Sequence, residues 1–377
     1  MNLALLYNIK ELLPDYRLST LKNMFIILMA ILQKETVCLY RLKSKIGSIS
    51  GKTGSSPHAH YTRCIRFFND HALSDLWLDI LSCAMVLLRH KTEYLVLDGT
   101  SWQYGQRKLH YLTLSVVYKG ISIPIFWVDL KKKGTSNSKE RQQLFLKAMR
   151  RLNLKGKTVL MDREYIGIDW LKFLKKNGID FVVRLKRGAY KKWVNEAGGK
   201  RYSALEHKIS RSRSAGKTVF KDFELSGLKV RLVMAKNHKN SQKEPIIYLL
   251  SSLPTSAKHI IKQYRLRWSI ETCFKNMKSS GFQLEKINLE CPGKARLLVA
   301  IVVLAYTLSV IEGLKGYAKV KVKKYSNGNI YKEISAFRKG IERITLKYED
   351  FKKFCRYVFR EIFMKISAYR NPDAIFV

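Results

Sequence analysis

Two aspartates of this 377-residue chain stand where chemistry is most readily expected. Asp98 follows the apolar run "YLVL" and Asp162 follows "TVLM", so each carboxylate marks the carboxyl end of an expected buried strand. Side chains at such ends emerge into a crevice of an α/β sheet, where sites usually lie. Two neighbouring carboxylates raise each other's pKa unless a cation neutralises them, and Mg²⁺ and Mn²⁺ prefer carboxylate oxygens. Alternatively, each aspartate caps the segment that follows it, as Asp129 at another expected strand end illustrates.

A third acid, Glu271, lies among cations and rings in the stretch "YRLRWSIETCFKNMK", which is expected to be a helix. At roughly 100° per residue, one face of this helix within about 60° carries Tyr264, Arg267, Glu271 and Lys278. The opposite side carries an apolar stripe of Leu266, Ile270, Cys273 and Met277, which can pack. The alternative is a solvated face on which Arg267 and Glu271 form an i,i+4 pair worth about 0.5 kcal/mol or less.

The three acids together with the basic helix face indicate phosphodiester chemistry. Cleavage through two metal ions uses two or three carboxylates to hold the ions about 4 Å apart. Arg267 and Lys278 could seat the phosphates that flank the scissile one. Tyr264 suits a strand whose bases must leave the stack.

The overall charge points to the same class of partner. The chain has 71 Lys+Arg against 29 Asp+Glu, a formal net charge of +42. Such a charge is best tolerated beside a polyanion, and nucleic acid is favoured over a membrane surface or a ribosome. The six cysteines show neither CxxC nor zinc-ligand spacing and indicate reduced thiols in a cytoplasmic protein. We expect no signal peptide, because the N-terminus shows neither a charged n-region nor a small-residue cleavage site. We also expect no membrane contact, because the apolar run 297–311 is shorter than the roughly 18 residues of a membrane span.

The elements that would position these residues change along the chain. Residues 1–92 show helical periodicity around a Gly- and Ser-rich stretch at 43–60, which is expected to be a loop. Three antiparallel strands follow, joined in part across Lys119-Gly120, and then helix, strand, helix and strand up to residue 186. Residues 184–243 hold seventeen Lys/Arg against four acids and indicate a β-rich basic insertion. Thr255 or Ser256 is expected to cap the long helix that contains Glu271.

The motif residues resemble a known family. The spacing of Tyr264, Arg267, Glu271 and Lys278 is similar to the YREK signature of DDE-type cut-and-paste transposases of bacterial insertion sequences. The strand-ending "LDGT" and "MDREY" and the basic insertion before Glu271 extend the resemblance over roughly residues 90–310. It implies a ribonuclease-H-like α/β core in which Asp98, Asp162 and Glu271 bind two Mg²⁺ ions, with Mn²⁺ able to substitute. It also implies that Tyr264, Arg267 and Lys278 contact the transposon end.

The patterns along the chain and the resemblance together give a division into three segments. Residues 1–92 are expected from their charge and position to be a helical, DNA-binding region, with a purely structural cap as the alternative. Residues 93–310 are expected to be the catalytic core, with the β-rich insertion at about 187–245. Residues 311–377 are expected to be a helical region that makes DNA or dimer contacts.

The expected function is a transposase that cleaves the terminal inverted repeats of its element. It would join the 3′-OH ends to target DNA, through a DNA hairpin intermediate as the family suggests. The expected partners are double-stranded DNA and, on DNA, a second copy of the chain, in the bacterial cytoplasm at the nucleoid. Two alternatives remain open: a ribonuclease-H-like nuclease or resolvase without strand transfer, and an inactive DNA-binding descendant.

Overall fold

The computed structural model describes residues 13–88, 92–104, 107–132, 134–196, 206–207, 209, 218–237, 245–326, 328 and 330–367. The chain packs into two compact units. Unit 1 comprises Met1–His90, Trp102–Lys108 and Cys273–Ile375, and unit 2 comprises Lys91–Ser101, Leu109–Thr272 and Phe376–Val377. The packing units therefore differ from three consecutive segments, because the chain from Cys273 onward groups with the N-terminal helices. The assignment of roles to those segments stays a prediction.

Unit 2 is built on one mixed sheet of eight strands in the order β3-β2-β1-β4-β5-β8-β7-β6. The strands are β1 (Tyr94–Tyr104), β2 (Arg107–Tyr118), β3 (Ile121–Asp129), β4 (Thr158–Met161), β5 (Asp180–Leu185), β6 (Thr218–Leu225), β7 (Leu228–Lys236) and β8 (Ile246–Ser251). β4 pairs parallel to both β1 and β5, whereas β2–β3, β5–β8, β7–β8 and β6–β7 are antiparallel. The expected α/β class is thus confirmed as a large mixed sheet with helices.

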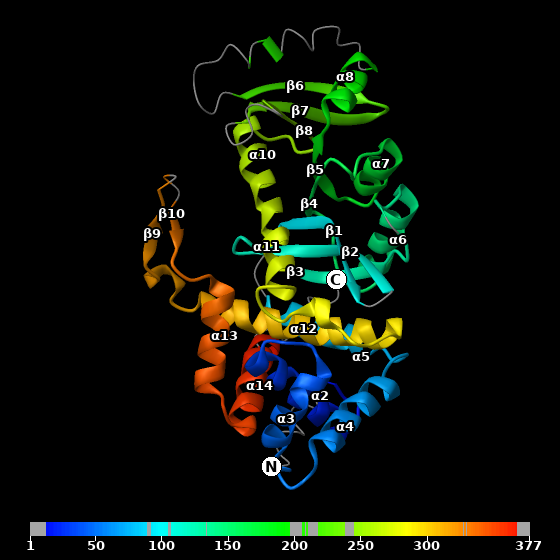
Figure 1. Cartoon of the computed structure of the whole chain (residues 1–377). Coiled ribbons are helices and arrows are strands. Elements are labelled where there is room, and N and C mark those ends of the chain that lie inside the picture. The colour runs from blue at the N-terminus through cyan, green and yellow to red at the C-terminus, as the bar shows by residue number, and fades with distance from the viewer. Residues whose placement is uncertain are drawn as a thin grey trace. The chain divides into compact units, whose positions relative to one another are not determined.

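The central strands of this sheet are buried on both faces. Three consecutive residues in each of β1, β4 and β5 are fully buried: Leu95–Leu97, Val159–Met161 and Phe181–Val183. Continuous apolar runs of this kind are typical of strands covered on both sides. Figure 1 shows α6 (Ser138–Met149) and α7 (Ile168–Lys176) on one side of the sheet and α10 (Ala257–Tyr264) on the other.

Two hairpin turns shape the ends of the sheet. Lys119 and Gly120 both have positive φ (49° and 82°), as a two-residue turn between β2 and β3 requires, and this confirms the predicted hairpin. Ser226 and Gly227 (50° and 84°) form the equivalent turn between β6 and β7. Those two strands lie in the expected β-rich insertion and extend the same sheet, after the helix α8 (Arg187–Glu196) that begins the insertion.

Unit 1 is mainly helical. Its helices are α2 (Leu18–Lys34), α3 (Leu39–Ser50), α4 (Pro57–Asp70), α5 (Leu76–Leu87), α12 (Pro292–Leu314), α13 (Ala336–Lys347) and α14 (Phe351–Ser367), with 3₁₀ turns η2 (Leu284–Lys286) and η3 (Tyr317–Lys319). The prediction of a loop over 43–60 was largely wrong, because α3 and α4 leave only six residues between them. Leu39, Leu42, Ile46 and Ile49 are buried at helical spacing, and this packing outweighs the low helix propensity of the intervening Gly and Ser.

The helix α12 forms the centre of unit 1. It has 23 residues, more than the apolar run 297–311, and packs against α5, α13 and α2. One helix of the described residues, this one, is long and apolar enough to cross a membrane, but 94% of its most apolar 18-residue window is buried in the protein. Such burial is typical of a core helix, because no apolar face is left for lipid.

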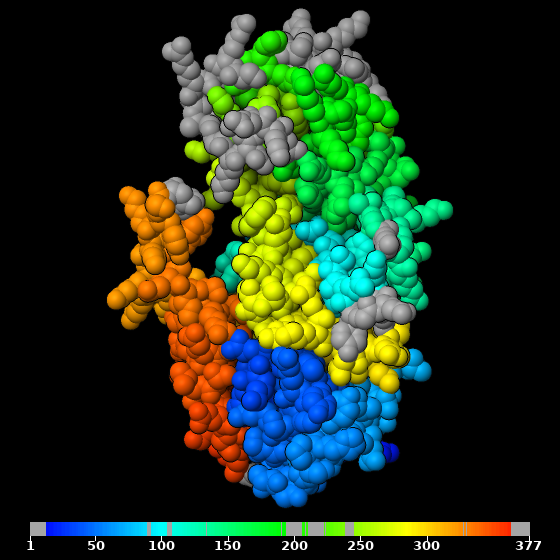
Figure 2. Space-filling model, in the orientation of Figure 1, coloured from blue at the N-terminus to red at the C-terminus, as the bar shows by residue number. Residues whose placement is uncertain are grey.

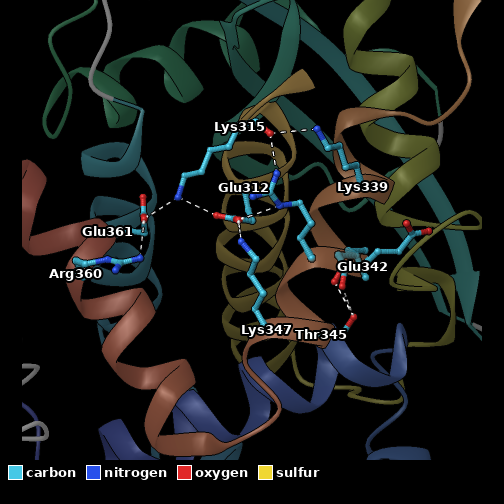
Figure 3. A network of polar contacts seen from close by, with 10 residues as sticks. Glu312, Lys315, Lys339, Glu342, Thr345, Lys347, Arg360 and Glu361 are labelled. Atoms are coloured by element: carbon cyan, nitrogen blue, oxygen red, sulfur yellow. Dashed lines mark hydrogen bonds and ion pairs between the residues drawn. The ribbon is translucent and has the colours of Figure 1, made fainter. Parts of the chain in front are cut away.

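A buried carboxylate links α12, α13 and α14 through cations. Glu312 is 2% exposed, and its oxygens lie 2.8 Å from Lys315 Nζ, 3.2 Å from Arg343 Nε and 3.9 Å from Lys347 Nζ. Lys315 also pairs with Glu361 of α14 at 2.8 Å. Figure 3 shows these side chains converging from the three helices.

The C-terminal region had been expected to be helical, but it also contains strands. Between α12 and α13 the chain forms a short antiparallel hairpin of β9 (Val322–Lys324) and β10 (Ile330–Lys332). Its strands are three residues long and expose every residue except the half-buried Lys332. They therefore lack the buried alternation by which strands are recognised in a sequence.

Candidate active site

The pairing of β1 with β4 brings Asp98 and Asp162 together. The parallel register matches Leu97 with Met161 in its last pair, and an aspartate follows each of them. β4 ends there, whereas β1 continues to Tyr104. Asp98 had been expected at the end of a strand, and this was wrong, because it lies within β1. It still marks the point where the parallel pairing stops, so both carboxylates leave the sheet at one edge.

Asp98 is held by two donors in a largely buried position. The Gly99 amide donates to Asp98 Oδ1 at 2.8 Å, and the Tyr165 hydroxyl donates to the same oxygen at 3.3 Å. Burial raises the pKa of Asp98 to about 6, and the charges of Glu164 and Asp162 act in the same direction. Arg267 and the Gly99 amide oppose this rise. A carboxyl group with this pKa gains from a nearby cation.

Arg267 connects Asp98 with the helical acid. Its Nη2 donates to Glu271 Oε1 at 2.6 Å, and its Nη1 lies 3.5 Å from Asp98 Oδ2. Arg267 is 8% exposed. Burial by itself would lower the pKa of Arg267, but Tyr264, Asp162, Glu271 and Asp98 together raise it. One guanidinium thus bridges two of the three predicted acids.

Tyr264 contacts the remaining acid. Its hydroxyl donates a long hydrogen bond of 3.5 Å to Asp162 Oδ1. Burial raises the pKa of Tyr264 above its ordinary range, and the charge of Asp162 adds to the effect. The tyrosine is therefore a neutral donor toward Asp162. The contacts thus join Asp98, Arg267 and Glu271 in one group and Asp162 and Tyr264 in another, and the charge of Asp162 also acts on Arg267, so the five side chains form one network of contacts and charges.

The basic and aromatic residues reach this network because the expected long helix is divided. It consists of α10, a 3₁₀ turn η1 (Arg265–Trp268) and α11 (Ser269–Met277). The Ser256 hydroxyl caps α10 by accepting from the His259 amide, in agreement with the predicted cap. Ser269 follows the turn, and its hydroxyl donates to the Leu266 carbonyl at 2.6 Å and lies 2.5 Å from the Ser122 hydroxyl of β3.

Lys278 belongs to the other packing unit. It follows α11 and lies in unit 1, where its ammonium lies 5.4 Å from the centre of the Trp102 ring. Burial lowers the pKa of Lys278, and the charge of Glu285 partly offsets this. Its predicted role beside the acids stays a prediction.

Two supporting residues, Arg141 and Tyr165, were missed by sequence reasoning. Arg141 is 5% exposed and donates to the carbonyls of Glu164 (3.2 Å) and Ile166 (3.4 Å), and its guanidinium lies 5.3 Å from the Tyr165 ring. It therefore fixes the loop after Asp162, and Tyr165 in that loop reaches Asp98. Tyr165 stands in the quoted "MDREY", and its spacing from Asp162 was the available signal. Asp129 has a local contact, accepting from the Lys131 amide at 3.1 Å.

The donor set suits a divalent metal ion, although the side chains are not gathered around one point. Among the described residues, no three His, Cys, Asp or Glu side chains form a group that could hold a metal ion. The oxygens of Asp98, Asp162 and Glu271 are nevertheless the ligand type that Mg²⁺ and Mn²⁺ prefer. The Arg267 guanidinium, between Asp98 and Glu271, already supplies positive charge at this place.

A comparison with protein families identifies the class of protein. Residues 89–308, more than half of the chain, match the family described as "Transposase DDE domain". The chain therefore belongs to the DDE transposases, a family of polynucleotidyl transferases and nucleases that generally use divalent metals. The matched range contains both strand-associated aspartates and Glu271.

Two further comparisons add little. Among solved structures, one that resembles the chain is the cryo-EM structure of a piggyBac transposase synaptic complex with hairpin DNA. The TM-score is 0.48 and the identity 14%, with 95% of this chain and 74% of that chain covered. A comparison with curated proteins gave no match.

Proposed function

We propose that this transposase binds the terminal inverted repeats of a bacterial insertion sequence, cleaves them and joins the resulting 3′-OH ends to target DNA. The observation that carries the proposal is the Leu97–Met161 register, which sets Asp98 beside Asp162, together with Arg267, which links Asp98 to Glu271. In the first step, water attacks a phosphodiester at the element's end, and the 3′-oxygen of the cleaved strand leaves as a 3′-hydroxyl. In the second, the freed 3′-hydroxyl attacks a phosphodiester of the opposite strand, giving a DNA hairpin, or of target DNA, and the 3′-oxygen of the attacked strand leaves with the proton.

Asp98, Asp162 and Glu271 are the residues that would hold Mg²⁺, with Mn²⁺ as a substitute. Bound divalent cations supply a clamp for the attacking and leaving oxygens of phosphoryl transfer. Tyr165 and the Gly99 amide orient Asp98 for this role, and Tyr264 orients Asp162. No Ser or Tyr nucleophile is assigned, because the reaction needs no covalent protein–DNA bond.

Arg267 would exchange partners when DNA binds. In the free protein it neutralises Asp98 and Glu271. A DNA phosphate, like a carboxylate, accepts strong hydrogen bonds from a guanidinium. Transfer of Arg267 to a phosphate would free Glu271 to join the two aspartates. Tyr264 and Lys278 are proposed as further contacts to the transposon end.

The architecture supports the subclass that the signature suggests. The order β3-β2-β1-β4-β5, with Asp98 on the first strand, Asp162 after the fourth and Glu271 on the later helix, is the arrangement expected of a ribonuclease-H-like core. We place the protein in the YREK group and in the bacterial cytoplasm at the nucleoid, acting as a homodimer on two DNA ends. The N-terminal helices would recognise the repeats, and residues 311–377 would contact DNA or the second copy.

The test uses the repeats that flank the coding region. Fluorescently labelled duplexes that carry these repeats are incubated with the protein and Mg²⁺, and cleavage and joining to a plasmid are measured. Asp98→Asn, Asp162→Asn and Glu271→Gln should each lower both activities by at least about a hundredfold, because a two-ion site loses a ligand. Asp129→Asn, at a strand end with a local contact, is the matched control and should keep parental activity.

The same assay separates the alternatives. Cleavage without any joined product would identify a nuclease or resolvase, and binding without cleavage would identify an inactive descendant. Parental cleavage by all three acid variants would refute the assignment of the site.

A further inference from the structure

The β9–β10 hairpin is an exposed arm whose role is not explained by packing. Figure 1 shows it (orange) extending from the N-terminal end of α13, and Figure 2 shows the same segment projecting as a ridge from that helix. Val322, Ile330 and Tyr331 are 60%, 63% and 55% exposed. Large apolar groups gathered in the open usually mark a binding surface.

The arm is held in shape at its base and across its strands. Lys332 Nζ donates to the carbonyls of Ala318 (2.9 Å) and Val320 (2.7 Å). Across the strands, Lys323 stands opposite Tyr331, whose ring meets the Tyr325 ring edge-on at 5.8 Å. The ring contact and the lysine anchor thus keep an arm in place that buries little surface of its own.

The charge of the arm is almost entirely positive. Residues 317–333 contain five lysines and one acid, Glu333. Within the described part of the chain, no acid forms an ion pair with Lys321, Lys323 or Lys324, and all three are exposed. Lys323 Nζ lies 5.8 Å from the centre of the Tyr325 ring, a contact that leaves its charge unneutralised. Exposed lysines without an acidic partner on a projecting arm are available to an external polyanion.

The alternative occupant, a second copy of this chain, is disfavoured by charge. Each copy carries a formal +42, so the arm would approach a surface of its own sign. Like charges brought together at an interface cost free energy. DNA offers the opposite charge and also sugar and base edges against which exposed rings can pack.

We propose that the β9–β10 hairpin binds double-stranded DNA, with Lys321, Lys323 and Lys324 on backbone phosphates and the rings of Tyr325 and Tyr331 on sugars. The proposal deepens the proposed transposase function and rests on it, because the DNA is either the element's end or the target.

The test compares three variants with the parent. K321Q/K323Q/K324Q removes the lysines, and Y325L/Y331L removes the rings. K155Q/K172Q/K176Q, on exposed positions in and near α7, removes the same charge elsewhere. Fluorescence anisotropy measures the affinity for a terminal-repeat duplex and for a random duplex of equal length. The salt concentration is varied from about 50 to 300 mM, so that the dependence of affinity on salt can be determined. Thermal unfolding checks that all variants fold.

The lysine variant should bind on the order of tenfold more weakly. If each of the three lysines contacts one phosphate, the slope of log K against log salt concentration should become less steep by about 2.7. The ring variant should bind several-fold more weakly with an unchanged slope, because the rings are neutral. A loss confined to the terminal-repeat duplex assigns the arm to the element's end, and a loss confined to the random duplex assigns it to the target.

Several outcomes would overturn the proposal. A lysine variant with the affinity and slope of the α7 control would refute the phosphate contact. An unchanged affinity in the ring variant would refute the proposed contact of the two tyrosines with DNA. A change of oligomeric state in light scattering with unaltered DNA binding would instead assign the arm to a second copy. If the parent itself neither binds nor cleaves repeat DNA, the transposase proposal fails first, and this result is distinct from the others.

Discussion

Arg267 allows a direct test of whether the acidic residues form a cation site. Arg267→Met keeps much of the buried stem of the side chain and removes the charge between Asp98 and Glu271. Removing one partner of a buried ion pair costs about 3–5 kcal/mol. The Asp98 contact is long, at 3.5 Å, and the Glu271 side chain is 38% exposed. We therefore expect the lower limit, a loss of about 3 kcal/mol in the free energy of unfolding without metal.

Magnesium should repair this loss if the three acids are its ligands. An ion present at about a hundred times its dissociation constant stabilises the folded state by about 2.7 kcal/mol. The variant should therefore regain most of its stability in Mg²⁺. The parent should gain less, because its guanidinium already neutralises the acids and competes with the ion.

The assay is urea denaturation of the parent and the variant, each with EDTA and with Mg²⁺. Arg265→Met is the control, because Arg265 lies in the same 3₁₀ turn but is exposed. It should change stability by less than about 0.5 kcal/mol. Equal stabilisation of parent and Arg267→Met by Mg²⁺ would refute the reasoning, and so would a loss in Arg267→Met no larger than in the control.

The remaining predictions concern the packing of unit 1, with one control, Gly188, in unit 2. Glu312→Gln leaves Lys315 and its neighbouring cations without their buried carboxylate and should cost about 3 kcal/mol. Glu342→Gln, at an exposed acid, should cost less than about 1 kcal/mol in the same urea titration. Gly340→Ala would bring a Cβ to 1.7 Å from the Ser309 carbonyl of α12 and should lower stability by more than about 3 kcal/mol. Gly188→Ala in α8, with open space around it, should be neutral or gain up to about 1 kcal/mol, and equal behaviour of the two glycine variants in thermal unfolding would contradict the close contact.

The elements with a strong apolar period were predictable from the sequence. α2, β3, β4 and β5 combine buried apolar runs with clear turn or cap residues, and they occur close to their expected positions. The continuation of β1 beyond Asp98 was not predictable, because "GTSWQY" is polar. This segment is extended because β1 has β2 beside it in the sheet.

That Asp98 and Asp162 lie side by side was predictable from the apolar runs before them, but the residues that support them were not. Arg141 contacts the loop after Asp162 through residues more than twenty positions away, so no local pattern reveals it. The β9–β10 hairpin was missed for a different reason. Its strands are too short and too exposed to show alternation, and their lysines are typical of any solvated segment.

The 3₁₀ turn at Arg265–Trp268 explains why the spacing of the motif residues matters. In a continuous α-helix, positions three apart differ by about 60° around the axis, whereas in a 3₁₀-helix they eclipse. Tightening the chain at this turn therefore aligns Tyr264 with Arg267, and the α-helix that follows places Glu271 four residues further on the same side. The alignment agrees with the contacts, since Tyr264 reaches Asp162 while Arg267 reaches both Asp98 and Glu271. A three-residue step followed by a four-residue step keeps the side chains within about 60° on a continuous α-helix, and a 3₁₀ turn that leads into an α-helix aligns them more closely. Ser269 marks the junction by its bonds to Leu266 and Ser122.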